Sequence, residues 1–166
     1  MSYMKPLTER EIRAAFVNCT KGEAKRLSVP RDLGDRPWED LDYLGWRDPL
    51  APGRAYLVAE LDGRSRALAL RCSGASPRTA RRSMCSVCVT THTGGVSLMV
   101  APKAGKAGRQ GDSVGIYLCG DLACSLYARG LKDAGPGARL HETLTTEEKI
   151  QRTVANLSAF VAKVTA

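Results

Sequence analysis

Two short stretches, Met84-Cys-Ser-Val-Cys88 and Cys119-Gly-Asp-Leu-Ala-Cys124, decide how the chain is expected to fold. The first holds a cysteine pair separated by two residues and the second a pair separated by four, with thirty residues between the pairs. A C-x2-C turn lets two thiolates point at one centre about 2.3 Å from each sulfur, which suits tetrahedral Zn²⁺. We therefore predict that Cys85, Cys88, Cys119 and Cys124 bind one structural Zn²⁺.

The residues around the second pair predict a treble clef. Residues 113–119 read as a strand, Gly120 breaks it, and Asp121 is expected to cap a helix over 122–131. One ligand at the strand end and one in the first helical turn can then converge with the first pair. Buried or redox-active cysteines are the alternative, but two spaced pairs in an intracellular chain are typical of a metal site.

Length and composition favour an ordinary globular protein. With 166 residues the chain is expected to form one domain that buries about two-thirds of its unfolded surface. The first ten residues contain no apolar run like that of a signal peptide, and no stretch approaches the length of a membrane span. We therefore expect a monomeric cytoplasmic protein with reduced thiols and no membrane association.

The net charge of +8 is concentrated in one part of the sequence. From Gly63 to Gly111 there is no acidic residue but there are nine basic ones: Arg64, Arg66, Arg71, Arg78, Arg81, Arg82, Lys103, Lys106 and Arg109. The other 16 basic and 17 acidic residues nearly balance. We expect the excess to flank the metal site, partly offsetting the thiolate charge and partly facing an acidic protein or a phosphate backbone. A solvated surface is the plain alternative.

Two short helices are expected near the start of the chain. Thr8 to Glu11 is a capping box that begins the first, and Thr20 to Glu23 begins the second, which Pro30 ends. The apolar face of the first helix consists of Ile12, Ala15, Phe16 and Cys19. Cys19 is therefore expected to be a small buried side chain.

The tryptophans are close together in the sequence. Residues 38–44 are expected to form a helical turn, with Trp38 inward, that Gly45 stops before Trp46. Because tryptophan is usually a packing residue, we predict that both indoles lie in the core.

Strands are expected in the middle of the chain. Residues 54–61 and 64–72 are predicted to form a half-buried hairpin, because the Asp62-Gly63 linker is typical of a type I′ turn. Residues 96–101 read as a buried strand. The glycine-rich segment 102–112 is predicted to be the long, mobile tip of the zinc-finger hairpin.

These elements predict an α+β fold, in which a treble-clef zinc finger is joined to an antiparallel β-hairpin or sheet with flanking N- and C-terminal helices. Thr145 and Glu148 are expected to cap the last helix, whose apolar side consists of Ile150, Val154, Leu157, Val161 and Val164. The single domain is then divided into helices and the Trp-rich segment (1–50), hairpin (54–72), finger (81–131) and C-terminal helix (145–165).

Several of these motifs together resemble a known family. The run Tyr43-Leu-Gly-Trp-Arg-Asp48, the two cysteine pairs, Val96-Ser-Leu98 and Ile116-Tyr-Leu-Cys119 are similar to the zinc-finger domain of elongation factor G-binding proteins. These include the FusB-type fusidic-acid resistance proteins and compact actinobacterial relatives. The resemblance extends from about Met4 to Ala162.

The resemblance implies that the four cysteines are the zinc ligands and that the protein binds elongation factor G, the ribosome, or both. In the family, the resistance proteins bind the factor through this domain and help release it from drug-stalled ribosomes. They also carry a helical-bundle domain before the finger, whereas about forty residues precede Leu44 here. We therefore expect factor binding more firmly than drug protection.

An RNA-binding zinc finger is the alternative function. The basic stretch suits a phosphate backbone, including that of ribosomal RNA. However, residues 78–109 contain no Phe, Tyr or Trp on which bases would stack. We expect Lys103, Lys106 and Arg109 to be the main partner-binding cations, because they recur every third residue between glycines in the predicted tip.

An enzymatic function is not expected. Four cysteines close the metal coordination sphere, whereas a catalytic zinc keeps an open position. The two histidines, His92 and His141, occur in no recognisable catalytic motif. His92 is a possible replacement ligand, but an ordinary turn histidine is the preferred interpretation. Cys19 and Cys72 have no assigned role.

Overall fold

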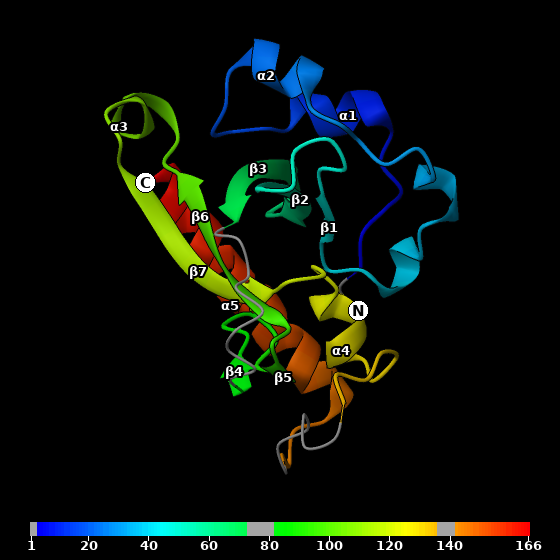
Figure 1. Cartoon of the computed structure of the whole chain (residues 1–166). Coiled ribbons are helices and arrows are strands. Elements are labelled where there is room, and N and C mark those ends of the chain that lie inside the picture. Colours follow the sequence, from blue (N-terminus) through cyan, green and yellow to red (C-terminus); the bar gives the residue numbers. More distant parts are fainter. Residues whose placement is uncertain (1–2, 73–81, 136–141) are drawn as a thin grey trace.

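The computed structural model describes residues 3–72, 82–135 and 142–166 and has the expected α+β architecture (Figure 1). A five-stranded antiparallel sheet has the order β1-β2-β3-β6-β7, and β4 and β5 form a separate two-stranded sheet. The strands are β1 (Leu44–Arg47), β2 (Arg54–Leu61), β3 (Arg64–Cys72), β4 (Arg82–Met84), β5 (Thr91–Thr93), β6 (Val96–Pro102) and β7 (Ser113–Cys119).

The β2–β3 hairpin forms as predicted. Leu61 pairs with Arg64, and Asp62 and Gly63 both have positive φ, 52° and 75°, as a type I′ turn requires. The prediction of a half-buried hairpin is wrong for β2, where residues 55–59 are all buried. Elements from the N-terminal and C-terminal parts of the chain cover the two faces of β2.

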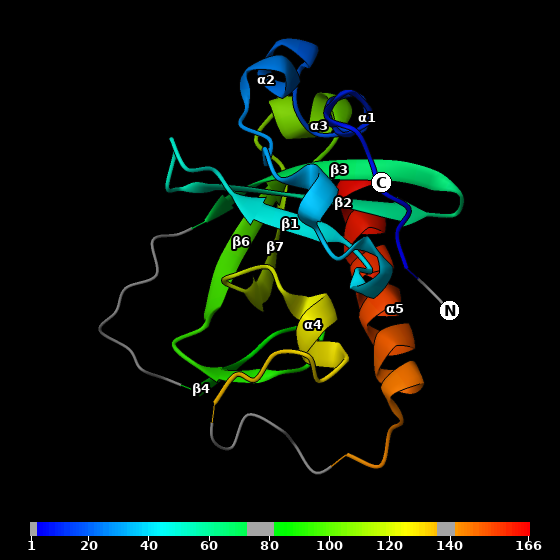
Figure 2. The same ribbon diagram turned by 90° about the vertical axis from the view of Figure 1, so that its right-hand side faces the viewer.

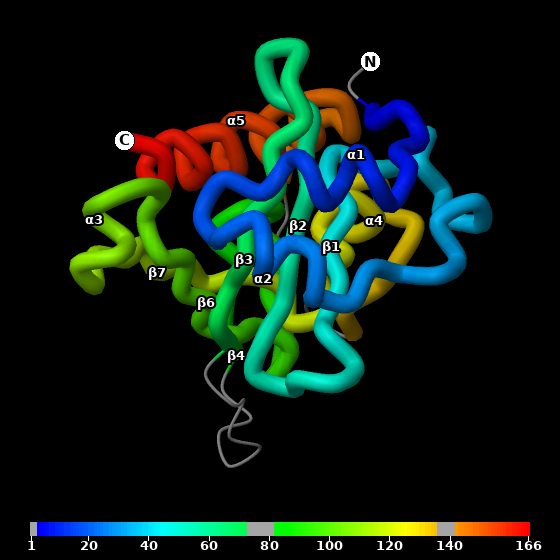
Figure 3. Tube along the Cα trace, turned by 90° about the horizontal axis from the view of Figure 1, so that it is seen from above, coloured from blue at the N-terminus to red at the C-terminus, as the bar shows by residue number. Residues whose placement is uncertain are grey.

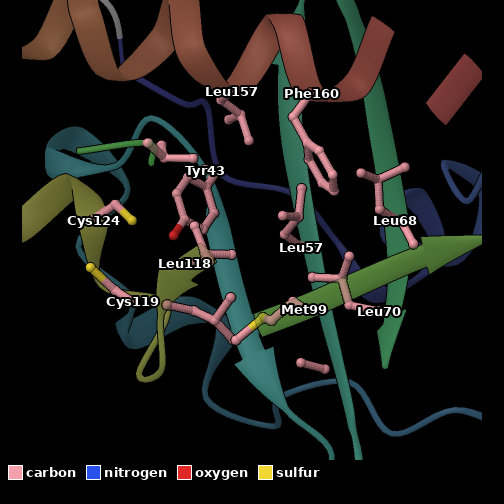
Figure 4. Close-up of a cluster of buried hydrophobic side chains, with 14 of the residues drawn as sticks. Tyr43, Leu57, Leu68, Leu70, Met99, Leu118, Cys119, Cys124, Leu157 and Phe160 are labelled. Atoms are coloured by element: carbon pink, nitrogen blue, oxygen red, sulfur yellow. The ribbon is translucent and has the colours of Figure 1, made fainter. Parts of the chain in front are cut away.

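The two faces of β2 belong to two hydrophobic clusters. On one face Leu57, together with Leu68 and Leu70 of β3, packs against Leu157 and Phe160 of helix α5 (Thr146–Thr165) (Figure 4). On the other face Tyr56, Val58 and Ala67 pack against N-terminal residues that include Ile12, Trp38 and Trp46. Figures 2 and 3 show the N-terminal helices and α5 on opposite sides of the β1–β3 part of the sheet.

Helix α1 (Glu9–Ala14) begins at the predicted capping box but ends earlier than expected. After the C-cap residue Ala15 the chain turns along β3, where the Ala67 N–H donates to Ala15 O (2.9 Å) and the Val17 N–H donates to Ala67 O (3.0 Å). Cys19 therefore lies outside the helix and is half-buried, which corrects the prediction. Helix α2 (Lys21–Arg26) follows, with Thr20 as its N-cap.

Both indoles lie in the core as predicted, and each N–H donates to a backbone carbonyl: Trp38 to Leu33 (2.8 Å) and Trp46 to Ser28 (2.7 Å). The helical turn expected over 38–44 is limited to the 3₁₀ helix η2 (Trp38–Asp40), since β1 begins at Leu44, and another 3₁₀ helix, η1 (Leu33–Asp35), precedes it. Gly45 does not end a helix. It lies in β1, where a Cβ atom would come 2.6 Å from Leu122 Cβ.

Helix α5 begins with the predicted Thr145–Glu148 capping box. Four of the five predicted apolar positions are buried, whereas Val154 is half-buried and Thr153 and Phe160 complete the packed face. The helix passes beneath the sheet, so that its C-terminal end lies close to the far end of the β6–β7 hairpin (Figure 1).

The segment between β6 and β7 is not the mobile loop predicted, since it contains helix α3 (Gly105–Arg109). Gly105 and Gly111 have positive φ (71° and 97°), and a Cβ at Gly108 would lie 1.7 Å from Lys103 O. The glycines spaced three residues apart therefore allow the chain to make a tight turn. Two backbone hydrogen bonds stabilise this turn. The Lys103 N–H donates to Asp112 O (2.9 Å) across the turn, and the Ala104 N–H donates to Val164 O (2.8 Å) of α5.

Candidate metal centre

The two cysteine pairs come together although thirty residues separate them. All four Sγ atoms lie within 4.8 Å of one another, and all four side chains are buried. Cys85 Sγ is 3.6 Å from Cys124 Sγ, and Cys88 Sγ is 3.4 Å from Cys119 Sγ. A tetrahedron with zinc–sulfur bonds of about 2.3 Å places its sulfurs about 3.8 Å apart, so the set is compatible with Zn²⁺.

The first pair lies on the turn between β4 and β5. The backbone N–H groups of Val87 and Cys88 point at Cys85 Sγ (3.3 and 3.5 Å), and the Val89 N–H donates to Cys85 O (3.0 Å). Donors aimed at a sulfur stabilise its thiolate form. Val89 closes the turn with φ of 63°, an unusual conformation for a β-branched residue.

The second pair comes from the end of β7 and the start of helix α4 (Cys124–Ala128). This helix is shorter than the predicted 122–131, and Asp121 is not its N-cap. Leu122 has φ of 57°, and the Asp121 carboxylate accepts instead from the Ala123 N–H (3.1 Å) and the Tyr127 hydroxyl (2.6 Å). The extra turn before the helix allows Cys124 to face Cys85.

His92 is not the turn histidine predicted. It is buried in β5, and its Nε2 atom lies 3.2 Å from Cys119 Sγ. The ring packs edge-on against Tyr127, with centroids 4.8 Å apart, and a Cβ at Gly95 would come 2.7 Å from it. His92 is outside the four-sulfur group, so it is placed to donate a hydrogen bond to a ligand thiolate.

Tyr43 also points its polar end toward the sulfurs (Figure 4). Its buried hydroxyl has no hydrogen-bond partner of standard geometry, and burial together with the thiol of Cys124 raises its pKa. A buried hydroxyl without a partner is costly, so a thiolate acceptor at Cys124 would satisfy it. The sequence gives no local signal for this role, because Tyr43 is 42 residues from the nearest ligand.

Burial and mutual hydrogen bonding give the four thiols different pKa values. Bonds with Cys119 above all lower the pKa values of Cys85 and Cys88, whereas burial is the main cause that raises the pKa of Cys124. A bond with Cys124 acts to lower the pKa of Cys119, but bonds with the other two thiols and burial outweigh it, and the pKa is raised. Metal binding is therefore expected to release protons.

The four-cysteine cluster is fixed to the rest of the molecule by buried polar contacts. Arg129, which follows α4, makes a bidentate ion pair with Asp42 (2.8 and 3.0 Å), and the Asp42 N–H donates to Ser125 Oγ (2.9 Å). Asn156 of α5 donates to the carbonyl of Val87 in the first turn (3.0 Å). Three distant segments therefore support the position of the sulfurs.

The expectation that the excess positive charge flanks the cysteines is wrong for the three cations of the predicted hairpin tip. Lys106 and Arg109 lie in α3 and Lys103 just before it, at the opposite end of a hairpin in which Val96 pairs with Cys119 and Pro102 with Ser113. Six strand residues span about 20 Å. The cations beside Cys88 instead line a cavity of about 320 Å³ and include Arg129, Lys132, Lys149 and Arg152. Arg78, Arg81 and His141 lie outside the described residues.

Comparison with protein families identifies this arrangement. The model of the FBP C-terminal treble-clef zinc finger matches residues 11–164. The chain belongs to this family. In the FBP zinc finger described here, the clef consists of the β4–β5 turn, the β6–β7 hairpin and α4, and the four cysteines are positioned for metal binding. Comparisons with curated proteins and with solved structures gave no match.

In Figure 1 the β4–β5 turn and α4 lie in the lower part and the β6–β7 hairpin extends up to α3, and the family match also covers the rest of the sheet and most of the flanking helices. In the part of the chain that the structure describes, no helix has the length and apolar character needed to span a membrane.

Proposed function

We propose that this protein binds one structural Zn²⁺ through Cys85, Cys88, Cys119 and Cys124, and that it uses the fold so held to bind elongation factor G, the ribosome, or both. The observation that supports this is the buried four-sulfur cluster in a chain of the FBP zinc-finger family. Four thiolates fill the coordination sphere, so the metal holds β7 and α4 against the β4–β5 turn and takes no part in catalysis. The reduced thiols that such a site requires favour the cytoplasm.

The proposed contact surface is the basic turn around α3. Lys106 and Arg109 are exposed, Lys103 is half-buried, and none of the three forms an ion pair within the described residues. The glycine turn and its bond to Val164 hold these cations on a preformed surface, which lowers the ordering cost of binding. Exposed cations of this kind chiefly raise the association rate with an acidic partner.

Affinity capture with the zinc-loaded protein, at low and moderate salt, tests the identity of the partner. We expect elongation factor G or ribosomal particles to be retained at moderate salt. Retention of bare RNA alone, with an affinity that falls steeply as salt rises, would instead favour the RNA-binding alternative.

Charge reversal tests the contact surface. The variant Lys103→Glu/Lys106→Glu/Arg109→Glu is expected to slow association at least about tenfold and to weaken its salt dependence. Its matched control is Lys5→Glu/Arg31→Glu/Arg64→Glu, three exposed cations outside α3. An unchanged association rate in a folded, zinc-loaded α3 variant would place the contact elsewhere.

A further inference from the structure

A groove of about 550 Å³ lies along helices α1 and α2. Figures 1 and 2 show these helices at the end of the molecule opposite to β4 and α4. Its apolar residues are Ala14, Phe16, Cys19 and Ala24. Its size is within the range of sites that accept a small ligand or a few side chains of a peptide. The fold and the proposed zinc site make no use of this groove.

The floor of the groove is preformed. The Arg13 guanidinium donates to three carbonyls at the end of α2, those of Ala24 (2.8 Å), Lys25 (3.0 Å) and Leu27 (2.8 Å), and so fixes α2 against α1. The half-buried ring of Phe16 meets Tyr56 edge-on, with centroids 5.9 Å apart. A ligand would therefore not have to order the helices before binding.

Beyond Phe16 the floor is equally well anchored. The side chain of Asn18 donates to Ala69 O (2.9 Å) and Pro102 O (3.0 Å) and accepts from the Ala69 N–H (2.8 Å). These bonds tie the chain between α1 and α2 to both β3 and β6. Cys19, next along the chain, is consequently held at the groove, where it is half-buried.

Charge around the groove is strongly one-sided. Arg10, Lys21 and Lys25 are exposed at its rim and make no ion pair within the described residues. The one acidic residue of the lining, Glu9, is paired with Arg13 (3.6 Å). Burial and, less strongly, Glu23 raise the pKa of Cys19, but Glu23 lines a separate pocket with Tyr56 and Ala69 and is not part of the groove lining. The rim therefore presents unpaired positive charge over an apolar floor.

We propose that this groove binds an acidic segment of a partner protein, which inserts one aromatic or aliphatic side chain against Phe16 while its carboxylates face Arg10, Lys21 and Lys25. Charge complementarity at the rim favours an acidic ligand, and the apolar floor favours one with an apolar anchor. A nucleic-acid backbone lacks that anchor. The proposal concerns a surface separate from α3 and does not depend on elongation factor G or the ribosome as the partner.

The test uses ¹⁵N-labelled, zinc-loaded protein and a short synthetic peptide of acidic residues around one central phenylalanine. We expect the peptide to shift the backbone amide resonances of Ala14, Phe16, Cys19 and Ala24 selectively. Replacing the peptide phenylalanine by alanine is expected to weaken binding about tenfold, because the floor then receives no side chain. Equal binding of the two peptides, or no shift at these amides, would overturn the proposal.

Two variants separate the groove from a general charge effect. Arg10→Glu/Lys21→Glu/Lys25→Glu should lower peptide affinity at least about tenfold, whereas the control Lys5→Glu/Arg31→Glu/Arg64→Glu should change it less than about twofold. Ala14→Trp, at an exposed position, fills the groove without removing a core contact and should also block binding. An oligonucleotide that shifts the same amides and displaces the peptide would identify a nucleic-acid site instead.

Discussion

The Nε2 atom of His92 lies 3.2 Å from the Sγ atom of Cys119, although His92 is on a strand that contributes no cysteine to the cluster. The histidine is buried, and Gly95 leaves room for its ring. This contact links the β4–β5 sheet to the β7 ligand. Together with Tyr43 near Cys124, it places possible hydrogen-bond donors beside the sulfurs, and such donors reduce the negative charge of thiolates without competing for the metal.

We predict that His92→Ala releases zinc at least about tenfold faster than the natural protein, because a lost hydrogen bond to a ligand typically weakens metal binding by that much. His92→Gln, which can still donate, should lose less. Zinc transfer to a chromophoric chelator measures the rate, and circular dichroism checks the fold. A His92→Ala protein that holds zinc as long as a Cys19→Ala control would show that the contact is incidental.

Tyr43→Phe is expected to destabilise the zinc-loaded protein more than the metal-free protein. In the zinc-loaded protein the hydroxyl donates to a thiolate, so its loss should lower the free energy of unfolding by about 1–2 kcal/mol. In the metal-free protein Cys124 is expected to be a protonated thiol, which is a weaker acceptor, so the same change should cost less. Urea unfolding of both forms measures the difference. An equal loss of stability in both forms would contradict a bond to the ligand thiolate.

Replacement of any one of Cys85, Cys88, Cys119 and Cys124 by serine should release zinc and loosen the region from β6 to α4, because metal binding and local folding are coupled. Cys19→Ala and Cys72→Ala should keep a full equivalent of zinc, since neither thiol is in the four-sulfur group. Metal analysis and hydrogen exchange provide the measurements. Zinc loss in either alanine variant, with retention in Cys124→Ser, would overturn the ligand assignment.

Gly108→Ala should destabilise the protein by about 2 kcal/mol, because a Cβ atom there would lie 1.7 Å from the Lys103 carbonyl oxygen and force the α3 turn apart. Gly34→Ala is the matched control, since no atom lies within 4 Å of its added Cβ and φ is not positive. Thermal unfolding compares the two. Equal stability would show that the α3 turn adapts easily and that its cations are not rigidly held.

The hydrogen bond between Asp48 and Tyr56 is expected to make part of the folding stability depend on pH. Burial alone would raise the pKa of Asp48, but hydrogen bonds from the Tyr56 hydroxyl (2.7 Å) and the Leu50 N–H (2.9 Å) outweigh it and leave the pKa lowered. A lowered folded-state pKa stabilises the protein above the unfolded pKa of about 3.9, and this stabilisation is lost as pH falls through the folded value.

Tyr56→Phe should therefore lower the free energy of unfolding by about 1–2 kcal/mol near neutral pH, and by progressively less below about pH 4. Comparing variant and natural protein at each pH cancels the separate acid effect of zinc loss. Asp48→Asn is the control. Because this variant lacks the titrating carboxyl group, the difference between its free energy of unfolding and that of the natural protein should depend on pH in the same range. A pH-independent effect of Tyr56→Phe would argue against a charged Asp48 acceptor.

Features that depend on neighbouring residues could be predicted from the sequence. The Thr8–Glu11 and Thr145–Glu148 capping boxes, the Asp62-Gly63 turn and the two cysteine spacings all form within a few residues, and each is present as predicted. Both capping box and hairpin turn satisfy backbone groups or backbone dihedrals locally, so distant residues change them little. The α+β class and the two cysteine pairs could be predicted from these local signals, and the demand of one metal ion for four ligands predicted that the pairs meet.

Contacts between distant segments were decided only by the tertiary structure. Helix α1 ends at Ala14 because residues 15–17 pair with Ala67, and α4 starts late because Asp121 bonds to Tyr127. His92 and Tyr43 reach the sulfurs through packing that no local pattern encodes. The length of the β6–β7 hairpin separates the α3 cations from the cysteines, since a strand advances about 3.3 Å per residue whatever charge it carries.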